Sequence, residues 1–340
     1  MSGTIAQQAA LDFVLTLRRR WSDQLFPVLA EQAEALDPDD DGFVAALHAT
    51  PAWPWFAWIE RGSQKMLWRA VGDAVGGEAA PSSGETLPGW YTDWDIHLQP
   101  GGVWSSDKAA RVYELGARLV MLGDNDDYRF HRLFAGTAVP KRDLRCIVDL
   151  GCGFGKSAWP LKQAFPQAEV IGVDLSAPCL DLARQRCAER GLEVRFVAAD
   201  ACATGLPDGC ADLVTSTMLI HEMPAEVLAA LYRESARLLA PGGSLRFLDF
   251  QHRGDRLRDQ MIDEHGDRNN EPFLPPMLAQ DQTALALAAG FVSPRWRAFD
   301  ERGVGLLNAL EWPERPEWHF PWAVLEAELP GAVLEAERAA

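Results

Sequence analysis

The chain has 340 residues, of which 48% are hydrophobic and 24% charged, a composition typical of folded globular proteins. Its 32 basic and 49 acidic residues give a formal net charge of −17, which disfavours binding to the negative phosphate backbone of nucleic acids. No apolar run approaches the roughly 18 residues of a membrane span, and the first residues lack the pattern of a secretion signal. We therefore expect a cytoplasmic protein that binds neither nucleic acid nor membranes.

The cysteines and acidic residues give no sign of a metal site. The six cysteines form no CxxC pair and lie in apolar or periodic segments, which indicates reduced thiols. The segment DPDDDG at 37–42 imitates the first half of a calcium loop, but His48 stands where the closing glutamate is required. We therefore expect no bound metal.

Apolar residues recur at helical spacing over about 4–36, 63–76 and 106–122. Eight of the 13 tryptophans lie before residue 141. We predict a helical, tryptophan-rich accessory domain over 1–140 that serves as a lid or a dimerisation unit. Rings at helical spacing are usually core or interface, but a lid would place some of them against a ligand. On this second interpretation, the substrate pocket is lined by Trp90, Trp94 and Trp104.

From residue 144 the pattern changes to short buried strands that alternate with helices. The predicted strands cover 146–150, 168–175, 192–200, 211–219 and 244–250. A helix at 279–289 and two strand-like runs, 291–299 and 304–312, follow. We predict an α/β fold over 141–312: a Rossmann-like, doubly wound, seven-stranded sheet, mostly parallel, with an antiparallel C-terminal hairpin. Residues 313–340, rich in Ala, Glu and Leu, are predicted to form a helical tail.

The most informative segment is VDLGCGFGK at 148–156, a strand that ends in glycines at alternate positions and leads into a helix. Glycines allow a sharp turn and let a ligand approach the backbone. A dinucleotide fingerprint would need glycine or alanine where Lys156 stands. A phosphate-binding loop would need glycine where Leu150 stands. Neither motif accounts for Asp149.

The segment does match, at every position, the D/E-x-G-x-G-x-G turn of class I S-adenosylmethionine-dependent methyltransferases. The chain resembles that superfamily, in its small-molecule methyltransferase type, over about 144–250. The resemblance implies that Asp174 takes the ribose hydroxyls of S-adenosyl-L-methionine and that Asp200 and Ala201 hold its adenine. The cofactor-binding residues implied are Asp149, Gly151, Cys152, Gly153, Gly155, Asp174, Leu175, Asp200, Ala201 and Met218.

Catalytic candidates should follow the fourth and fifth strands, because ligands of such sheets lie at the carboxyl ends of the strands. His221 and Glu222 follow the fourth strand and His252 the fifth, whereas His97 would reach the substrate from the accessory domain. Each is a candidate base or polar orienting group. A capping role for His221 and a solvated loop position for His252 remain the alternatives.

We therefore expect S-adenosylmethionine-dependent methyl transfer to a small, aromatic or apolar metabolite by in-line displacement. Two alternatives use the same fold: an aminopropyl transferase, and a regulatory protein that binds the cofactor without turnover. The first predicted helix carries apolar residues on more than one face, so a homodimer is also expected.

Overall fold

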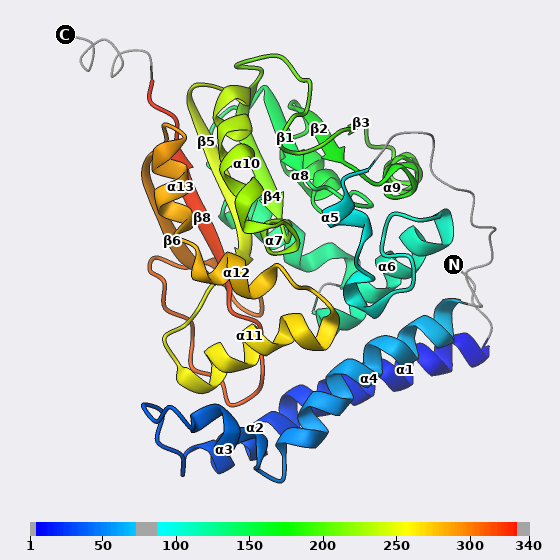
Figure 1. Ribbon diagram of the computed structural model, residues 1–340. Coiled ribbons are helices and arrows are strands. Elements are labelled where there is room, and N and C mark those ends of the chain that lie inside the picture. Colours follow the sequence, from blue (N-terminus) through cyan, green and yellow to red (C-terminus); the bar gives the residue numbers. More distant parts are fainter. Residues whose placement is uncertain (1–4, 73–86, 125, 332–340) are drawn as a thin grey trace.

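The computed structural model describes residues 5–72, 87–124 and 126–331. It contains one mixed sheet of eight strands flanked by helices, with a helical N-terminal unit along one side (Figure 1). Among the described residues, no helix is both long and apolar enough to cross a membrane.

Five parallel strands form the larger part of the sheet. They are β1 (Cys146–Leu150), β2 (Glu169–Asp174), β3 (Arg195–Ala198), β4 (Ala211–Thr217) and β5 (Leu239–Phe250). The strand order β3-β2-β1-β4-β5-β8-β6-β7 reverses direction at β1 and β4. Every residue of β1 is buried, as expected for a strand with packed layers on both faces. The predicted Rossmann-like, mostly parallel fold is therefore confirmed, with eight strands rather than seven.

The crossover helices begin where the sequence places capping residues. Ser176 caps α9 (Ala177–Glu189) by accepting a hydrogen bond from the Cys179 N–H. Asp281 caps α13 (Gln282–Ala288) in the same way through Thr283 and Ala284. The remaining helices of this half are α8 (Ala158–Ala164), α10 (Ala225–Leu238), α11 (Arg256–Asn269) and α12 (Leu274–Ala279).

The C-terminal edge of the sheet differs from the prediction. The run predicted as a strand over 304–312 forms only the two-residue β7 (Gly305–Leu306), which pairs with β6 (Val292–Asp300). The predicted helical tail is wrong for β8 (Trp322–Glu328), which lies antiparallel between β5 and β6. Residues 332–340 of that tail lie outside the described residues.

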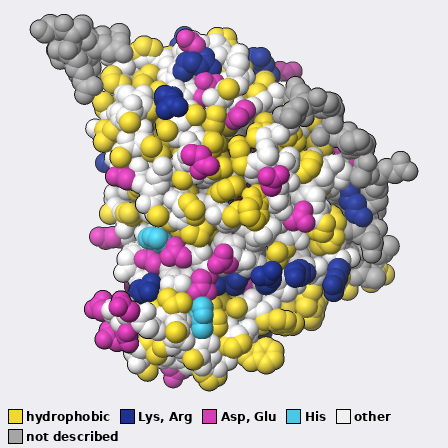
Figure 2. Space-filling view, in the orientation of Figure 1, with side chains coloured by type: hydrophobic (Ala, Val, Ile, Leu, Met, Phe, Trp, Pro, Cys, Tyr) yellow, Lys and Arg dark blue, Asp and Glu magenta, His cyan; other side chains and the backbone are white. Residues whose placement is uncertain are grey.

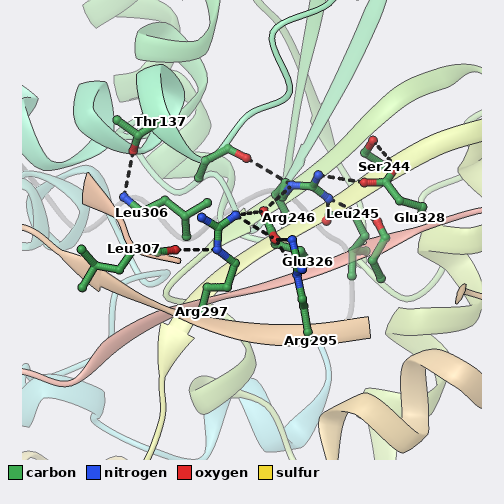
Figure 3. A network of polar contacts seen from close by, with 12 residues as sticks. Thr137, Ser244, Leu245, Arg246, Arg295, Arg297, Leu306, Leu307, Glu326 and Glu328 are labelled. Atoms are coloured by element: carbon green, nitrogen blue, oxygen red, sulfur yellow. Dashed lines mark hydrogen bonds and ion pairs between the residues drawn. The ribbon is translucent and has the colours of Figure 1, made fainter. Parts of the chain in front are cut away.

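Ion pairs with both neighbouring strands explain how an Ala- and Glu-containing segment can form this inner strand. Glu326 of β8 pairs with Arg295 and Arg297 of β6, and Glu328 pairs with Arg246 of β5 (Figure 3). The two acidic side chains thus meet guanidinium partners on both neighbouring strands, while both backbone edges of β8 are hydrogen-bonded. Tertiary pairing here outweighs the intrinsic helical preference of the segment.

The N-terminal unit is helical, as the periodicity predicts. It contains α1 (Ile5–Arg20), α2 (Phe26–Ala33), α3 (Phe43–His48), α4 (Trp53–Gly72), α5 (Gly89–Thr92), α6 (Asp107–Val120) and α7 (Arg129–Thr137). A short π-helical segment, Trp21–Leu25, joins α1 to α2. In Figure 2 basic side chains form a row over α4, on which Arg61, Lys65 and Arg69 are exposed at four-residue spacing. The net negative charge is therefore unevenly distributed over the surface.

One hydrophobic core joins the N-terminal helices to the sheet. Trp21, Phe26 and Phe56 pack against Trp318, which lies in the loop before the last strand. The Ser22 hydroxyl donates to the Trp318 carbonyl over 2.7 Å. Trp21 and Trp318 are almost completely buried and act as core residues.

Candidate active site

The glycine turn follows β1 and enters α8 with three left-handed residues. Gly151 has φ +66°, and a Cβ at this position would lie 2.7 Å from the Leu219 side chain, so no larger residue fits. The N–H groups of Gly151 and Cys152 donate to the Val173 carbonyl of β2, which holds the turn against the second strand.

Asp149 stabilises the glycine turn through side-chain hydrogen bonds. Its buried carboxylate accepts hydrogen bonds from Ser157 Oγ (2.6 Å) and Thr215 Oγ1 (3.0 Å). Burial raises the pKa of this carboxyl to about 7, against the lowering effect of the two hydroxyl donors. Asp149, Cys152 and Gly155 thus shape the turn and do not line the cavity above it.

Above the turn lies a cavity that we call the outer cavity. Asp174, at the end of β2, faces it, and its two oxygens accept from the N–H groups of Gly153 (2.7 Å) and Ser176 (2.8 Å). Asp200 accepts from the Cys202 N–H over 2.8 Å. The lining residues are Trp90, Tyr91, Ile96, Val103, Tyr113, Gly151, Gly153, Asp174, Leu175, Cys179, Ala199, Asp200, Ala201, Met218, Leu219, Glu222, Met223 and Phe273.

A second cavity, the inner cavity, lies between the sheet and helices α4 and α6. It is lined by Gln64, Leu67, Trp68, His97, Gln99, Val112, Tyr113, Gly116, Ala117, Met121, His131, Lys156, Met218, His221, Glu222, Phe250, His265, Glu271 and Trp322. Tyr113, Met218 and Glu222 line both cavities. The two cavities are therefore adjacent and share a wall at the end of β4.

His221 and Asp249 form a buried pair on that wall. His221 Nδ1 lies 2.6 Å from Asp249 Oδ1, which leaves Nε2 of the imidazole facing the inner cavity. Burial alone would lower the pKa of His221, but the charge and hydrogen bond of Asp249 raise it to about 9. The other oxygen of Asp249 accepts from the Ile220 N–H, so the carboxylate is held at both ends.

Acidic and imidazole groups alternate along the cavity from this pair. Glu222 Oε1 lies 3.9 Å from His221 Nε2 and 3.0 Å from His97 Nε2, and His97 Nδ1 lies 3.4 Å from Glu271. Glu271 in turn lies 3.8 Å from His265 Nε2. Burial lowers the pKa of His97 and raises that of Glu222 to about 7. Burial thus disfavours the charged form of both partners of this hydrogen bond.

The other residues predicted for catalysis and for the pocket lie elsewhere. His252 pairs with Asp263 over 2.8 Å at a partly exposed position and lines neither cavity. Trp90 lines the outer cavity and packs edge-on against Phe273. Trp94, which is 39% exposed, and Trp104 line neither of the two cavities.

Several lining residues were missed by the sequence reasoning. Lys156 was considered only as part of nucleotide-binding motifs: it breaks the dinucleotide fingerprint and matches the end of a phosphate-binding loop. Its side chain lines the inner cavity. Tyr113, His265 and Glu271 carry no motif. They reach the site from α6, α11 and the loop after α11, a convergence that only the folded chain reveals.

Comparison with known proteins relates this site to a family. Residues 147–243 match the family described as "Methyltransferase domain". A demethylmenaquinone methyltransferase of Thermus thermophilus is 41% identical over 140 residues, which are 41% of this chain and 60% of that protein. A trans-aconitate 2-methyltransferase of Methylobacterium radiotolerans is 39% identical over 107 residues, 32% of this chain and 38% of that protein.

Among solved structures, a SAM-dependent methyltransferase of Thermotoga maritima is 20% identical with a TM-score of 0.45, covering 64% of this chain and 96% of that one. The chain spans less than two thirds of the length of the curated relatives named above. The residues that match the family model, 147–243, contain the glycine turn, Asp174 and Asp200. Residues 147–243 thus match a methyltransferase domain, in agreement with the resemblance to class I S-adenosylmethionine-dependent methyltransferases.

Proposed function

We propose that this protein binds S-adenosyl-L-methionine in the outer cavity and transfers its methyl group to a small molecule in the inner cavity. The observation that carries the proposal is the wall formed by Tyr113, Met218 and Glu222, which face both cavities. Methyl transfer needs the nucleophile and the cofactor in line at such a junction, shielded from water.

The residues around the outer cavity fit the cofactor. Gly151 and Gly153 line the cavity with bare backbone, and the Asp174 carboxylate can accept from two hydroxyl groups besides its backbone donors. Asp200, Ala201, Leu175 and Met218 line the part where the nucleoside would lie. The cofactor supplies a methyl group already activated on a cationic sulfur, so the chain has to bind, align and exclude water.

The inner cavity suits an aromatic or apolar small molecule. Its wall includes Trp68, Tyr113, Phe250 and Trp322. The relatives named above are a demethylmenaquinone and a trans-aconitate methyltransferase, both enzymes of small molecules. His221, oriented by Asp249, is the proposed base for any substrate that must lose a proton, and Glu222 and His97 are polar orienting groups.

A turnover experiment tests this function. The protein is incubated with methyl-deuterated S-adenosylmethionine and a fractionated metabolite extract, and mass spectrometry follows labelled products together with S-adenosylhomocysteine. We expect a labelled small molecule with equimolar S-adenosylhomocysteine. Because Glu222 and Glu271 also face the cavity, decarboxylated cofactor is offered with polyamines in parallel. Release of methylthioadenosine there would favour aminopropyl transfer, and cofactor binding without turnover would favour a regulatory protein.

Cofactor binding is tested separately by calorimetry with S-adenosylhomocysteine. Asp174→Asn removes a carboxylate from the cavity and should weaken binding tenfold or more, since hydrogen bonds to a charged group contribute about 1.5–3 kcal/mol. Asp181→Asn, on the exposed side of α9, is the matched control and should bind normally. Equal affinity of the two variants would contradict the assignment of Asp174.

The assembly and the location of the chain also remain proposals. Helix α1 buries Val14 and Leu15 but leaves Phe13 61% exposed, which is consistent with a second copy packing there as a homodimer. Sedimentation of the purified protein and of Phe13→Glu would test this. The free cysteines are the structural observation that supports the proposed cytoplasmic location.

A further inference from the structure

Lys156 places a buried ammonium group in the inner cavity. The residue is 3% exposed, and its Nζ donates to Tyr113 Oη over 2.9 Å and lies 3.7 Å from Met218 Sδ. Within the described part of the chain, no carboxylate forms an ion pair with Nζ at 4.0 Å or less. A phenol and a thioether do not neutralise a cation, so this charge lacks a direct counter-ion.

The nearby acidic groups are engaged elsewhere. Glu222 is hydrogen-bonded to His97, Glu271 lies between His97 and His265, and Asp249 is held by His221. Burial lowers the pKa of Lys156, and the more distant Glu222 and Asp174 only partly oppose this effect. An anion placed against Nζ would therefore relieve an unfavourable arrangement.

The position of the ammonium group says where such an anion would lie. Tyr113 and Met218, its two contacts, line both cavities, whereas Lys156 itself lines the inner one. The group thus lies at the junction, on the substrate side. The cofactor also has a carboxylate, but Lys156 is absent from the lining of the outer cavity.

We infer that the inner cavity binds an apolar, ring-sized molecule through one ionised oxygen, a phenolate or enolate, that pairs with Lys156 Nζ and accepts from Tyr113 Oη beside the junction. The inference depends on the proposed methyl transfer in one respect only: methyl transfer would make the bound molecule a substrate. Lysine is a compact cation that suits a single oxygen atom. The apolar walls around it strengthen the attraction by excluding water.

The test uses 4-nitro-1-naphthol, an apolar phenol whose neutral and ionised forms absorb at different wavelengths. The full-length protein is saturated with S-adenosylhomocysteine, and the bound dye is titrated with pH. The titratable groups that face the dye from the surrounding elements are Tyr113, His97, His131, His221, Glu222, His265 and Glu271. The dye is compared in the wild type, Lys156→Met, Tyr113→Phe and Lys141→Met, an exposed lysine that serves as the matched control.

In the wild type and Lys141→Met, the pKa of the bound dye should fall by one unit or more, a tenfold increase in the ratio of phenolate to phenol. Tyr113→Phe should reduce this shift, and Lys156→Met should abolish it while S-adenosylhomocysteine affinity stays normal. Failure of the wild type to bind the dye, or the same shift in Lys156→Met, would overturn the inference. Loss of S-adenosylhomocysteine affinity in Lys156→Met with the dye shift intact would overturn it too, and would assign Lys156 to the cofactor carboxylate.

The outcome is separable from that of the proposed function. The pKa shift of the bound dye is measured without turnover, so the spectra alone decide whether the anion site exists. If Lys156→Met does not fold, the wild-type shift and its reduction in Tyr113→Phe still decide the inference. A dye shift without labelled product in the turnover experiment would contradict methyl transfer and leave the anion site in place.

Discussion

His221 owes both its orientation and its charge to a single neighbour. Asp249 occupies the end of β5 and accepts from His221 Nδ1 and from the Ile220 N–H, so the imidazole cannot turn its Nε2 away from the inner cavity. A carboxylate that orients a histidine and stabilises its cationic form is a recurring arrangement in general acid–base catalysis. In this protein the pair is almost completely buried, which makes the electrostatic effect large.

Asp249→Asn should lower the pKa of His221 well below about 9, because burial would then be opposed only by the weaker effects of Glu222 and Glu271. A histidine whose pKa is raised on folding stabilises the native state below pH 6.5, and this contribution is lost as pH rises through about 9. The variant should therefore lose stability at pH 6 but little at pH 10. Histidine NMR titration and urea unfolding at both pH values measure these effects.

Asp263→Asn is the matched control, because it removes the carboxylate partner of the partly exposed His252. We expect a change in unfolding free energy of less than about 1 kcal/mol there, as exposed ion pairs contribute little. An unshifted His221 titration in Asp249→Asn would show that the pair does not set the charge of this histidine.

Among single residues, the sequence was informative about candidates that directly follow a strand. His221 and Glu222 were predicted from their place after the fourth strand, and both face the inner cavity. Trp94 and Trp104 were chosen from the density of tryptophans, a feature that does not tell a cavity from a core. Lys156 was missed because it was compared only with nucleotide-binding motifs, and the position of its side chain relative to a ligand was not considered.

Among the elements, β8 shows most clearly that a local sequence pattern can predict the wrong secondary structure. Its sequence, WAVLEAE, has helix-forming residues and only partial alternation, and nothing in it indicates pairing with β5. The strand forms because two β-strand neighbours supply backbone partners and arginines for Glu326 and Glu328. The parallel strands were predictable because each is a short apolar run bounded by turns, whereas β8 depends on residues 31 and 82 positions away.

Helices α4 and α11 are joined by a buried charge cluster. Glu60 of α4 accepts from His265 Nδ1 over 2.6 Å and from the Arg268 guanidinium, both on α11. Arg18 of α1 is buried nearby and donates to Ser63 Oγ over 3.0 Å. Burial alone would raise the pKa of Glu60, but Arg268 and His265 lower it to about 2. The single carboxylate of Glu60 thus interacts with basic side chains of two helices, α11 and α1.

Glu60→Gln should destabilise the protein by about 3–5 kcal/mol, because it leaves buried cations without their anion. A carboxylate whose pKa is depressed on folding contributes stability above pH 4.5, and that contribution is lost as pH falls through about 2. The difference between wild type and variant should therefore shrink in acid, measured by urea unfolding at pH 7 and pH 3. Glu31→Gln, on the exposed side of α2, should be neutral.

If Glu60→Gln lowers the free energy of unfolding by less than about 1 kcal/mol, water or neighbouring groups must stabilise the buried cations in place of the carboxylate. A loss independent of pH would show that the effect comes from packing rather than from charge.

In the molecule as a whole, the N-terminal helices form part of the candidate active site. Residues from this unit line both cavities, including Tyr91 and Val103 in the outer one and Trp68 in the inner one. The same unit shares a hydrophobic core with the sheet through Trp21 and Trp318. A helical N-terminal unit was predictable from periodicity, but the side of the sheet that it covers depends on contacts distant in sequence.

This arrangement predicts where cofactor binding will slow hydrogen exchange. Saturation with S-adenosylhomocysteine should protect amides in residues 90–113 as well as in the glycine turn at 150–156, because both line the outer cavity. Mass spectrometry of the free and loaded protein measures this protection, and Asp174→Asn at the same ligand concentration should show much less. Protection confined to the loops of the sheet would mean that the N-terminal unit does not close over the cofactor. In that case the inner cavity would be open to water during turnover, and the shielding that strengthens the Lys156 and His221 interactions would be lost.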